Sequence, residues 1–280
     1  MTVIGIDVGG STTKIIAVKN SEIMKPMQVT ANDPQTSVYG AFGRYINENG
    51  LDLSDVNRIM ITGVGSSFVV ENIYGIVTEH ISEFDAIGKG GLYLSGLDNA
   101  IIVSMGTGTS FIKADNKKIV RIGGTGVGGG TLLGLSSKFI HVRHFDTIVN
   151  LAAEGNLSNI DLTVGDISVN QVTAMPDFTT ASNFGKISDY ATKSDIAKGL
   201  INMVLQTIGV MAAFACKIDD TKDVVLCGNL TAVPDAQECF DGIKELHGVN
   251  FIIPKYAEYA TALGAALVAI EKSKGVKNEF

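Results

Sequence analysis

The segment DVGGSTTK, residues 7–14, places a carboxylate, two glycines, three hydroxyl side chains and an ammonium group next to one another. Small residues let backbone N–H groups converge on one small space, which suits a phosphate group. The hydroxyls add donors, Lys14 adds a positive charge, and Asp7 could hold a magnesium-bound water. The alternative is an ordinary glycine-rich turn in which the carboxylate caps the backbone. This segment alone does not decide between the two interpretations.

A second segment of the same kind is GTGTS, residues 106–110. Aligned, IGIDVGGSTTK (residues 4–14) and IVSMGTGTSFI (residues 102–112) both read as a strand, a Gly/Thr-rich tip and a second strand. They lie about a hundred residues apart, which suggests an internal repeat. Two such hairpins that face one another would hold a nucleoside triphosphate from both sides. The pair is therefore a sharper signal than either hairpin alone.

A glycine-rich run, GGTGVGGGT at residues 123–131, contains the dinucleotide pattern G-x-G-x-x-G. That pattern needs a strand ending in an acidic residue about twenty positions on, and a helix is expected there instead. The alternative is a helix that begins at Thr131, whose free N–H groups and dipole favour an anion. The P-loop pattern G-x-x-x-x-G-K-[ST] does not occur in the sequence, which disfavours a P-loop enzyme.

Two carboxylates stand at an expected helix start in Ser82-Glu83-Phe84-Asp85. They could simply complement the helix dipole, or Glu83 could serve as a general base in a cleft between the two halves. Arg121, just ahead of the glycine run, is either a surface charge or a clamp for an anionic substrate group. The four histidines and three cysteines show no metal-ligand spacing.

Hydrophobic periodicity predicts an α/β protein in which a strand-rich pattern starts twice. We place the boundary between residues 96 and 99, which divides the chain into domains 1–98 and 99–280. Expected strands cover residues 3–7, 13–18, 25–30, 58–62, 100–104, 110–114, 118–122, 224–226 and 250–253. Expected helices cover residues 36–49, 82–93, 131–140, 145–154, 189–217, 235–246 and 258–272, and residues 156–185 are less regular.

The composition excludes several classes of protein. A formal net charge of −7 in 280 residues gives no electrostatic reason to bind nucleic acid. With 45% hydrophobic residues the chain can bury a core. The most apolar window, residues 200–216, is interrupted by Asn202 and Gln206, so a core helix is expected rather than a membrane span. No signal peptide is seen, and three cysteines fit a reducing cytosol, so we expect a cytoplasmic protein.

The motifs DVGGSTTK, SEFDA, VSMGTGTS, RIGGTGVGGGTLLGL, FTTASNFGK and VVLCGN, in that order, resemble the type II (eukaryotic-like) pantothenate kinases. These belong to the actin/Hsp70/sugar-kinase superfamily, and the similarity runs from Asp7 to about Gly264. The resemblance implies two similar ribonuclease-H-like α/β domains with a nucleotide cleft between them. It also implies phosphorylation of pantothenate by ATP and Mg²⁺, the entry step of coenzyme A synthesis, in a homodimer.

Matched position by position, the resemblance makes Glu83 the catalytic base and Arg121 the group that reaches the substrate and the transferring phosphoryl group. Thr107 and Ser110 match contacts near the substrate and phosphate, and Asp7 lies near Mg²⁺. Phe145 and Asn229 stand where a relative has Tyr and Ser, and FTTASNFGK also departs from the family form. The remaining nucleotide contacts implied are Val8, Gly9, Gly10, Ser11, Thr12, Thr13, Lys14, Gly129, Gly130, Thr131, Leu132 and Leu133.

Three alternatives stay open. A sugar kinase of the same superfamily would explain the hairpins but not the Glu-Phe-Asp-Ala element. An ATPase activator of a radical dehydratase would need cysteines for an iron–sulfur cluster, which Cys216, Cys227 and Cys239 do not match. A catalytically silent nucleotide-binding protein is the third. The long helix expected at residues 189–217 is either a dimer interface or core.

Overall fold

Two large sheets of matching topology form the body of the protein. The structure, a computed structural model, describes residues 1–30, 33–168, 175–234 and 236–275. The first sheet runs β4-β2-β1-β5-β6, with β3 also paired to β2, and the second runs β9-β8-β7-β12-β13. In each sheet the first two strands form an antiparallel hairpin, the third pairs antiparallel with the second, and the last two are parallel to the first. This repeated order confirms the predicted fold class of two similar ribonuclease-H-like units.

The central strand of each sheet is buried on both faces. This explains why β1 and β7 read as near-continuous apolar runs in the sequence. The first sheet comprises β1 (Thr2–Val8), β2 (Thr12–Lys19), β3 (Glu22–Ile23), β4 (Met27–Thr30), β5 (Arg58–Thr62) and β6 (Thr78–His80). The second comprises β7 (Asn99–Met105), β8 (Thr109–Asp115), β9 (Ile119–Thr125), β12 (Asp223–Cys227) and β13 (Asn250–Ile252).

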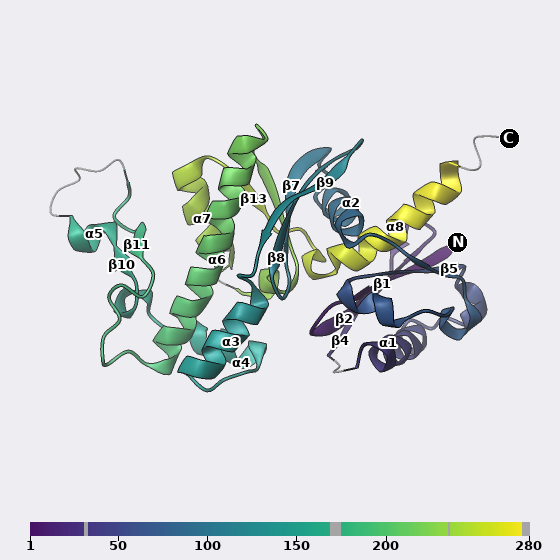
Figure 1. The fold of residues 1–280 in the computed structure, drawn as a ribbon, viewed down its shortest axis with the longest axis horizontal. Helices are drawn as coiled ribbons and strands as arrows, with labels where there is room; N and C mark the ends of the chain where they lie inside the picture. Colours follow the sequence, from purple (N-terminus) through teal and green to yellow (C-terminus); the bar gives the residue numbers. More distant parts are fainter. Residues whose placement is uncertain (31–32, 169–174, 235, 276–280) are drawn as a thin grey trace.

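Helices cover both faces of each sheet (Figure 1). The outer face of the first sheet packs on α1, and Ile6 of β1 and Phe42 of α1 belong to one apolar core. The outer face of the second sheet packs on α6, and Val103 of β7 and Leu200 of α6 belong to another. The helices are α1 (Pro34–Glu48), α2 (Glu83–Ser95), α3 (Gly129–Phe139), α4 (Phe145–Ala153), α6 (Lys193–Ile218), α7 (Ala236–His247) and α8 (Ala260–Gly275).

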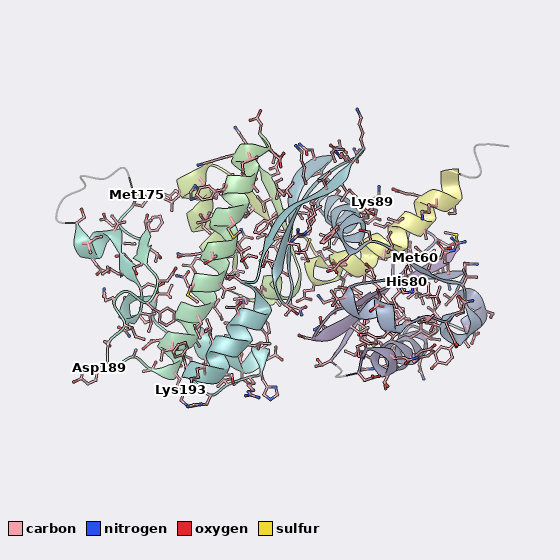
Figure 2. The ribbon with its side chains drawn as sticks, in the orientation of Figure 1. Met60, His80, Lys89, Met175, Asp189 and Lys193 are labelled. Carbon is pink, nitrogen blue, oxygen red and sulfur yellow. The ribbon has the colours of Figure 1, made fainter. Side chains whose placement is uncertain are left out.

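The two helices between the sheets are exchanged between the halves of the chain. Helix α8, from the end of the sequence, packs on the first sheet, and α2 packs on the second. The two helices cross in close contact, because a Cβ on Gly90 would overlap the carbonyl oxygen of Ala260 and one on Gly264 would overlap that of Ala86. An ion pair from Lys89, labelled in Figure 2, to Glu271 joins their exposed sides at 2.6 Å. The halves are therefore held together by backbone-to-backbone packing.

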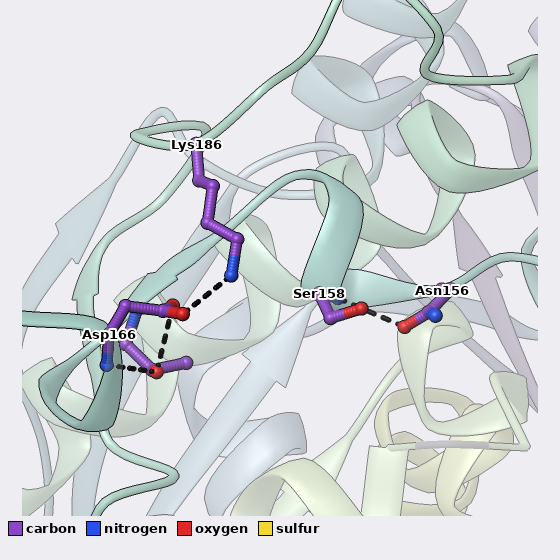
Figure 3. A network of polar contacts seen from close by, with 5 residues as sticks. Asn156, Ser158, Asp166 and Lys186 are labelled. Carbon is purple, nitrogen blue, oxygen red and sulfur yellow. Dashed lines mark hydrogen bonds and ion pairs between the residues drawn. The ribbon is translucent and has the colours of Figure 1, made fainter.

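A small polar arm extends from α6 on the side away from the first sheet (Figure 1). It holds β10 (Leu162–Thr163), α5 (Val164–Ile167) and β11 (Thr180–Ser182). Lys186 donates to Asp166 at 2.6 Å within the arm (Figure 3). The buried Asp161 carboxylate fastens the arm to α6, since it accepts from Asn202 at 2.7 Å and from the Phe184 backbone at 2.8 Å. The FTTASNFGK motif thus lies in this arm.

Most predicted elements are confirmed, with shifted ends. Helix α6 begins at Lys193, later than expected, because the Thr192 side chain accepts from the backbone of Asp195 and caps it there. The short strands of the arm and β6 were not expected. The expected start of the next helix, residue 235, lies outside the described residues. In the described part of the chain α6 alone is long and apolar enough to cross a membrane, yet 61% of its apolar window is buried inside the protein, as in a core helix.

Candidate active site

The first hairpin places a carboxylate and an ammonium group side by side on the inner face of the first sheet. Asp7 of β1 and Lys14 of β2 are cross-strand partners in the register. Residues two apart on a strand share a face, so both lie on the side of Val3 and Ile16, which pack on α8. Only 6% of Lys14 is exposed. The alternation of β1 and β2 therefore aims both charges at the space between the sheets.

Neither charge has a direct protein partner. Within the described residues, no hydrogen bond or ion pair within 4 Å engages the Asp7 carboxylate or the Lys14 ammonium. Burial raises the pKa of Asp7 to about 6, against the opposing influence of Lys14 and with a smaller contribution from Glu83. Burial likewise lowers the pKa of Lys14, against the influence of Asp7 and Glu258. Charged groups in such surroundings are costly when no ion pair within 4 Å offsets them, and perturbed pKa values of this kind mark Asp7 and Lys14 as candidate site residues for a cation and an anion.

The first tip is backed by a loop that the sequence analysis did not assign. Gly63, directly after β5, has φ 89°, and a Cβ there would lie 2.6 Å from Oδ1 of Asp7. Gly65 comes equally close to Val8. A cavity of about 280 Å³ opens beside this loop and the first tip. The signal was the GVGSS segment after a buried strand, which indicates a close backbone approach.

The second tip is joined to the start of α3. The Gly129 amide donates to the Gly106 carbonyl at 2.9 Å, and the Gly130 amide donates to the Thr107 carbonyl at 2.8 Å. The expectation of free N–H groups, made for a helix that begins at Thr131, therefore does not extend to the amides of Gly129 and Gly130. They are used to build the tip, because the glycines let the helix start lie directly against it. The expected helix start at Thr131 also moves forward, to Gly129.

The structure brings the two tips together. A Cβ placed on Gly10 would lie 3.6 Å from Oγ1 of Thr107. The Thr109 hydroxyl donates to the Val127 carbonyl at 2.8 Å, which ties the second tip to the glycine run. The glycine run is thus part of the second hairpin and follows an antiparallel strand, which excludes the dinucleotide interpretation.

Glu83 lies on α2, the helix that packs on the second sheet. It is the first residue of α2, after Ser82, whose hydroxyl accepts from the Asp85 amide at 3.5 Å. Burial raises the pKa of Glu83. Glu83 also contributes to the raised pKa of Asp7, so the two carboxylates interact electrostatically. Ser82 therefore caps the helix, and Glu83 takes no part in that cap.

Arg121 of β9 extends to the start of α2. Its side chain is exposed, and Cζ lies 5.3 Å from the centre of the Phe84 ring. Arg121 therefore lies at the helix start where Glu83 is the first residue. A third charged residue, Glu258, was missed because it lies alone in a short turn between β13 and α8, and this turn packs against β2.

The two positions that depart from the family form lie in different surroundings. Asn229 follows β12 at the end of the second sheet, where a Cβ on Gly228 would overlap the Met105 carbonyl beside the second tip. Phe145 begins α4 and packs against the core built around α6. Ser110 pairs with Ser104 just behind the second tip.

The residues present fit a magnesium ion held mainly by phosphate and water. No group of three or more His, Cys, Asp or Glu side chains that could hold a metal occurs among the residues the structure describes. Asp7 is a single carboxylate without a protein partner, and Mg²⁺ often takes one or two carboxylates together with waters and substrate phosphates.

Matching sheets, facing hairpin tips and exchanged central helices define the fold of the actin/Hsp70/sugar-kinase superfamily. The activator of 2-hydroxyisocaproyl-CoA dehydratase from Clostridium difficile, solved with bound ADPNP, has this fold, with a TM-score of 0.71 at 19% identity over 100% of this chain and 98% of that chain. The ROK hexokinase from Thermus thermophilus gives a TM-score of 0.57 at 14% identity over 98% and 100%.

Proteins of similar sequence identify the family to which the chain belongs within this superfamily. The BadF/BadG/BcrA/BcrD ATPase family model matches residues 4–136, and the Fumble family model matches residues 97–238. A type II pantothenate kinase of Bacillus anthracis is 31% identical over 96% of this chain and 98% of its own length. One from Bacillus cereus is 32% identical over 81% and 84%. The chain belongs to the type II pantothenate kinase family, which confirms the resemblance.

Proposed function

We propose that this protein transfers the γ-phosphoryl group of ATP to the primary hydroxyl of pantothenate, which gives 4′-phosphopantothenate for coenzyme A synthesis. Family membership supports the substrate. The proximity of the two tips supports the geometry, because a Cβ on Gly10 would lie 3.6 Å from Oγ1 of Thr107, which places the second tip beside the hairpin that carries Asp7 and Lys14. Phosphoryl transfer requires mainly positioning and charge neutralisation, and this site is built for both.

Each charged residue receives a role. Lys14 binds phosphate oxygens, Arg121 offsets the charge on the transferring phosphoryl group and reaches the substrate, and Glu83 accepts the hydroxyl proton. Thr107 and Ser110 contact the substrate and the phosphate. We propose the following nucleotide contacts: Asp7, Val8, Gly9, Gly10, Ser11, Thr12, Thr13, Lys14, Thr107, Gly129, Gly130, Thr131, Leu132, Leu133, Phe145 and Asn229.

Asp7 would hold Mg²⁺, through a water molecule. When bound, this ion supplies positive charge against the phosphate oxygens. The protein contributes a carboxylate whose ionised form burial disfavours, and the positive charge would stabilise that ionised form.

An assay of ADP release with and without pantothenate tests the proposal. A pantothenate kinase releases ADP only with pantothenate and adds one phosphoryl group to it, measurable by mass spectrometry. An ATPase activator would release ADP regardless, a sugar kinase would respond only to a sugar, and a silent binder would release none. The thiols disfavour the activator, because burial raises the pKa of Cys216, Cys227 and Cys239 to about 12, which opposes the thiolate form that metal clusters need.

We also propose a cytoplasmic homodimer. Helix α6 supports it, because Phe214 and Ile218 near its end are 53% and 84% exposed although they are large and apolar. Sedimentation of the wild type beside Ile218→Lys tests the dimer. We expect the wild type to sediment as a dimer and the variant to be shifted toward monomer. A wild type that sediments as a monomer would refute the dimer.

A further inference from the structure

Phe84 lies between the two carboxylates at the start of α2, and 36% of it is exposed. The Arg121 guanidinium stands over its ring at 5.3 Å from the centroid. A cation within about 6 Å of a ring centre is attracted by the negative face of the ring. Arg121 therefore contacts the ring of Phe84, although acidic residues precede and follow Phe84 in the sequence.

Arg121 does not pair with either neighbouring carboxylate. In the part of the chain that the structure describes, no ion pair within 4 Å joins Arg121 to Glu83 or Asp85. Such a pair would use guanidinium N–H groups and hold the glutamate in its ionised, less basic form. A contact with a ring face uses the positive charge but none of the five N–H donors.

The guanidinium also lies against a second element. A Cβ on Gly124 would lie 2.6 Å from Nη2 of Arg121, so the arginine lies against a stretch of β9 that carries no side chain at this position. Phe84 comes from α2 and Gly124 from the second sheet. The guanidinium therefore lies between an aromatic ring and bare backbone, neither of which pairs with its N–H donors.

We infer that Phe84 is a positioning residue, whose ring holds the Arg121 guanidinium away from Glu83 and leaves its N–H groups for an anionic substrate oxygen. This inference rests on the proposed function, in which Arg121 binds the transferring phosphoryl group. It gives the Phe of the Glu-Phe-Asp-Ala element a role of its own, because that side chain sets the distance between the base and the cation.

Kinetics of Phe84→Leu and Phe84→Tyr test this role. The leucine keeps apolar volume but has no ring face, so kcat should fall about two- to fivefold while ATP affinity stays unchanged. The tyrosine should restore kcat, and Tyr93→Leu, at the exposed far end of the same helix, should leave it unchanged. In an Arg121→Met background, Phe84→Leu should have no further effect. Equal losses in both backgrounds, or a tyrosine variant as slow as the leucine variant, would overturn the inference.

A spectroscopic measurement separates this inference from the proposed function. In the NMR spectrum, the Nε–Hε signal of Arg121 can be assigned by its loss in Arg121→Met. In the wild type the ring should shift this signal upfield, and in Phe84→Leu the signal should move back to its unshifted position. If pantothenate is not phosphorylated but the shift is present, the proposed function fails while the placement by Phe84 stands. If phosphorylation occurs and the shift is absent, Phe84 does not place the arginine.

Discussion

Replacing Glu83 by Gln tests the central step of the proposed mechanism. The substitution keeps the size of the side chain and the start of α2 but removes the proton acceptor. A positioned base contributes about 10²–10⁴-fold to rate, equivalent to about 3–5 kcal/mol of barrier. Burial raises the pKa of Glu83 and so strengthens it as a base. We therefore expect kcat to fall at least about a hundredfold, with ATP affinity retained.

Asp85→Asn is the matched control, because Asp85 lies in the same first turn of α2 and is exposed. Either substitution removes one negative charge from the helix start, which changes stability by about 0.3–1 kcal/mol. An effect of charge alone would therefore appear in both variants, whereas loss of the base would appear only in Glu83→Gln.

The assay is pantothenate-dependent ADP release at saturating ATP, followed across pH. A base works only when it is deprotonated, so wild-type kcat should rise with pH as Glu83 loses its proton. The Gln variant should lack this rise. A Gln variant as active as the wild type, or an Asn control that falls as far, would refute the assignment of Glu83.

Three further predictions concern the same site and its support. Burial raises the pKa of Asp7 from 3.8 to about 6, so the folded protein holds this proton more tightly than the unfolded chain does. The free energy of unfolding of the wild type should therefore fall by up to about 3 kcal/mol as pH rises from about 4 to 6. The melting temperature of Asp7→Asn should be higher than that of the wild type at pH 7 but not at pH 3. The variant should also lose magnesium-dependent ATP binding. Equal melting temperatures at pH 7 would contradict the unpaired carboxylate. Lys14→Met should weaken ATP binding about 10- to 150-fold by isothermal titration, since a charged hydrogen bond contributes about 1.5–3 kcal/mol; unchanged affinity would exclude a phosphate contact. Gly90→Ala should lower the free energy of unfolding by about 1–3 kcal/mol or more in urea, because its Cβ overlaps α8. Gly40→Ala, in an exposed position of α1 with nothing within 4 Å of its Cβ, should instead stabilise by about 0.5–1 kcal/mol; a loss of similar size in both would disprove the close helix crossing.

Short-range patterns were sufficient to predict the hairpins and most helices. Strands such as β1 carry continuous apolar residues, and α2 has Ser82 at its start, so local chemistry defines both. The pairing of Asp7 with Lys14 also follows from the short tip between them. The candidate site could be outlined because its residues cluster in sequence around two tips and one helix start.

Other features depend on contacts between distant segments. The apolar face of a helix shows that it is buried but not against which sheet, so the exchange of α2 and α8 could not be predicted. The amides of Gly129 and Gly130 donate to carbonyls of the second tip, and these acceptors lie more than twenty residues away in the sequence. Glu258 carries no local signal, because its neighbourhood to Lys14 arises only when the turn before α8 packs on β2.

The position of α8 also constrains how a newly made chain can fold. The inner face of the first sheet, with Val3 and Ile16, is covered by residues near the end of the sequence such as Leu263. During synthesis that face emerges from the ribosome long before its cover exists. The amino-terminal half must therefore remain incomplete, with an uncovered apolar face open to chaperones or to other nascent chains, until α8 has been translated.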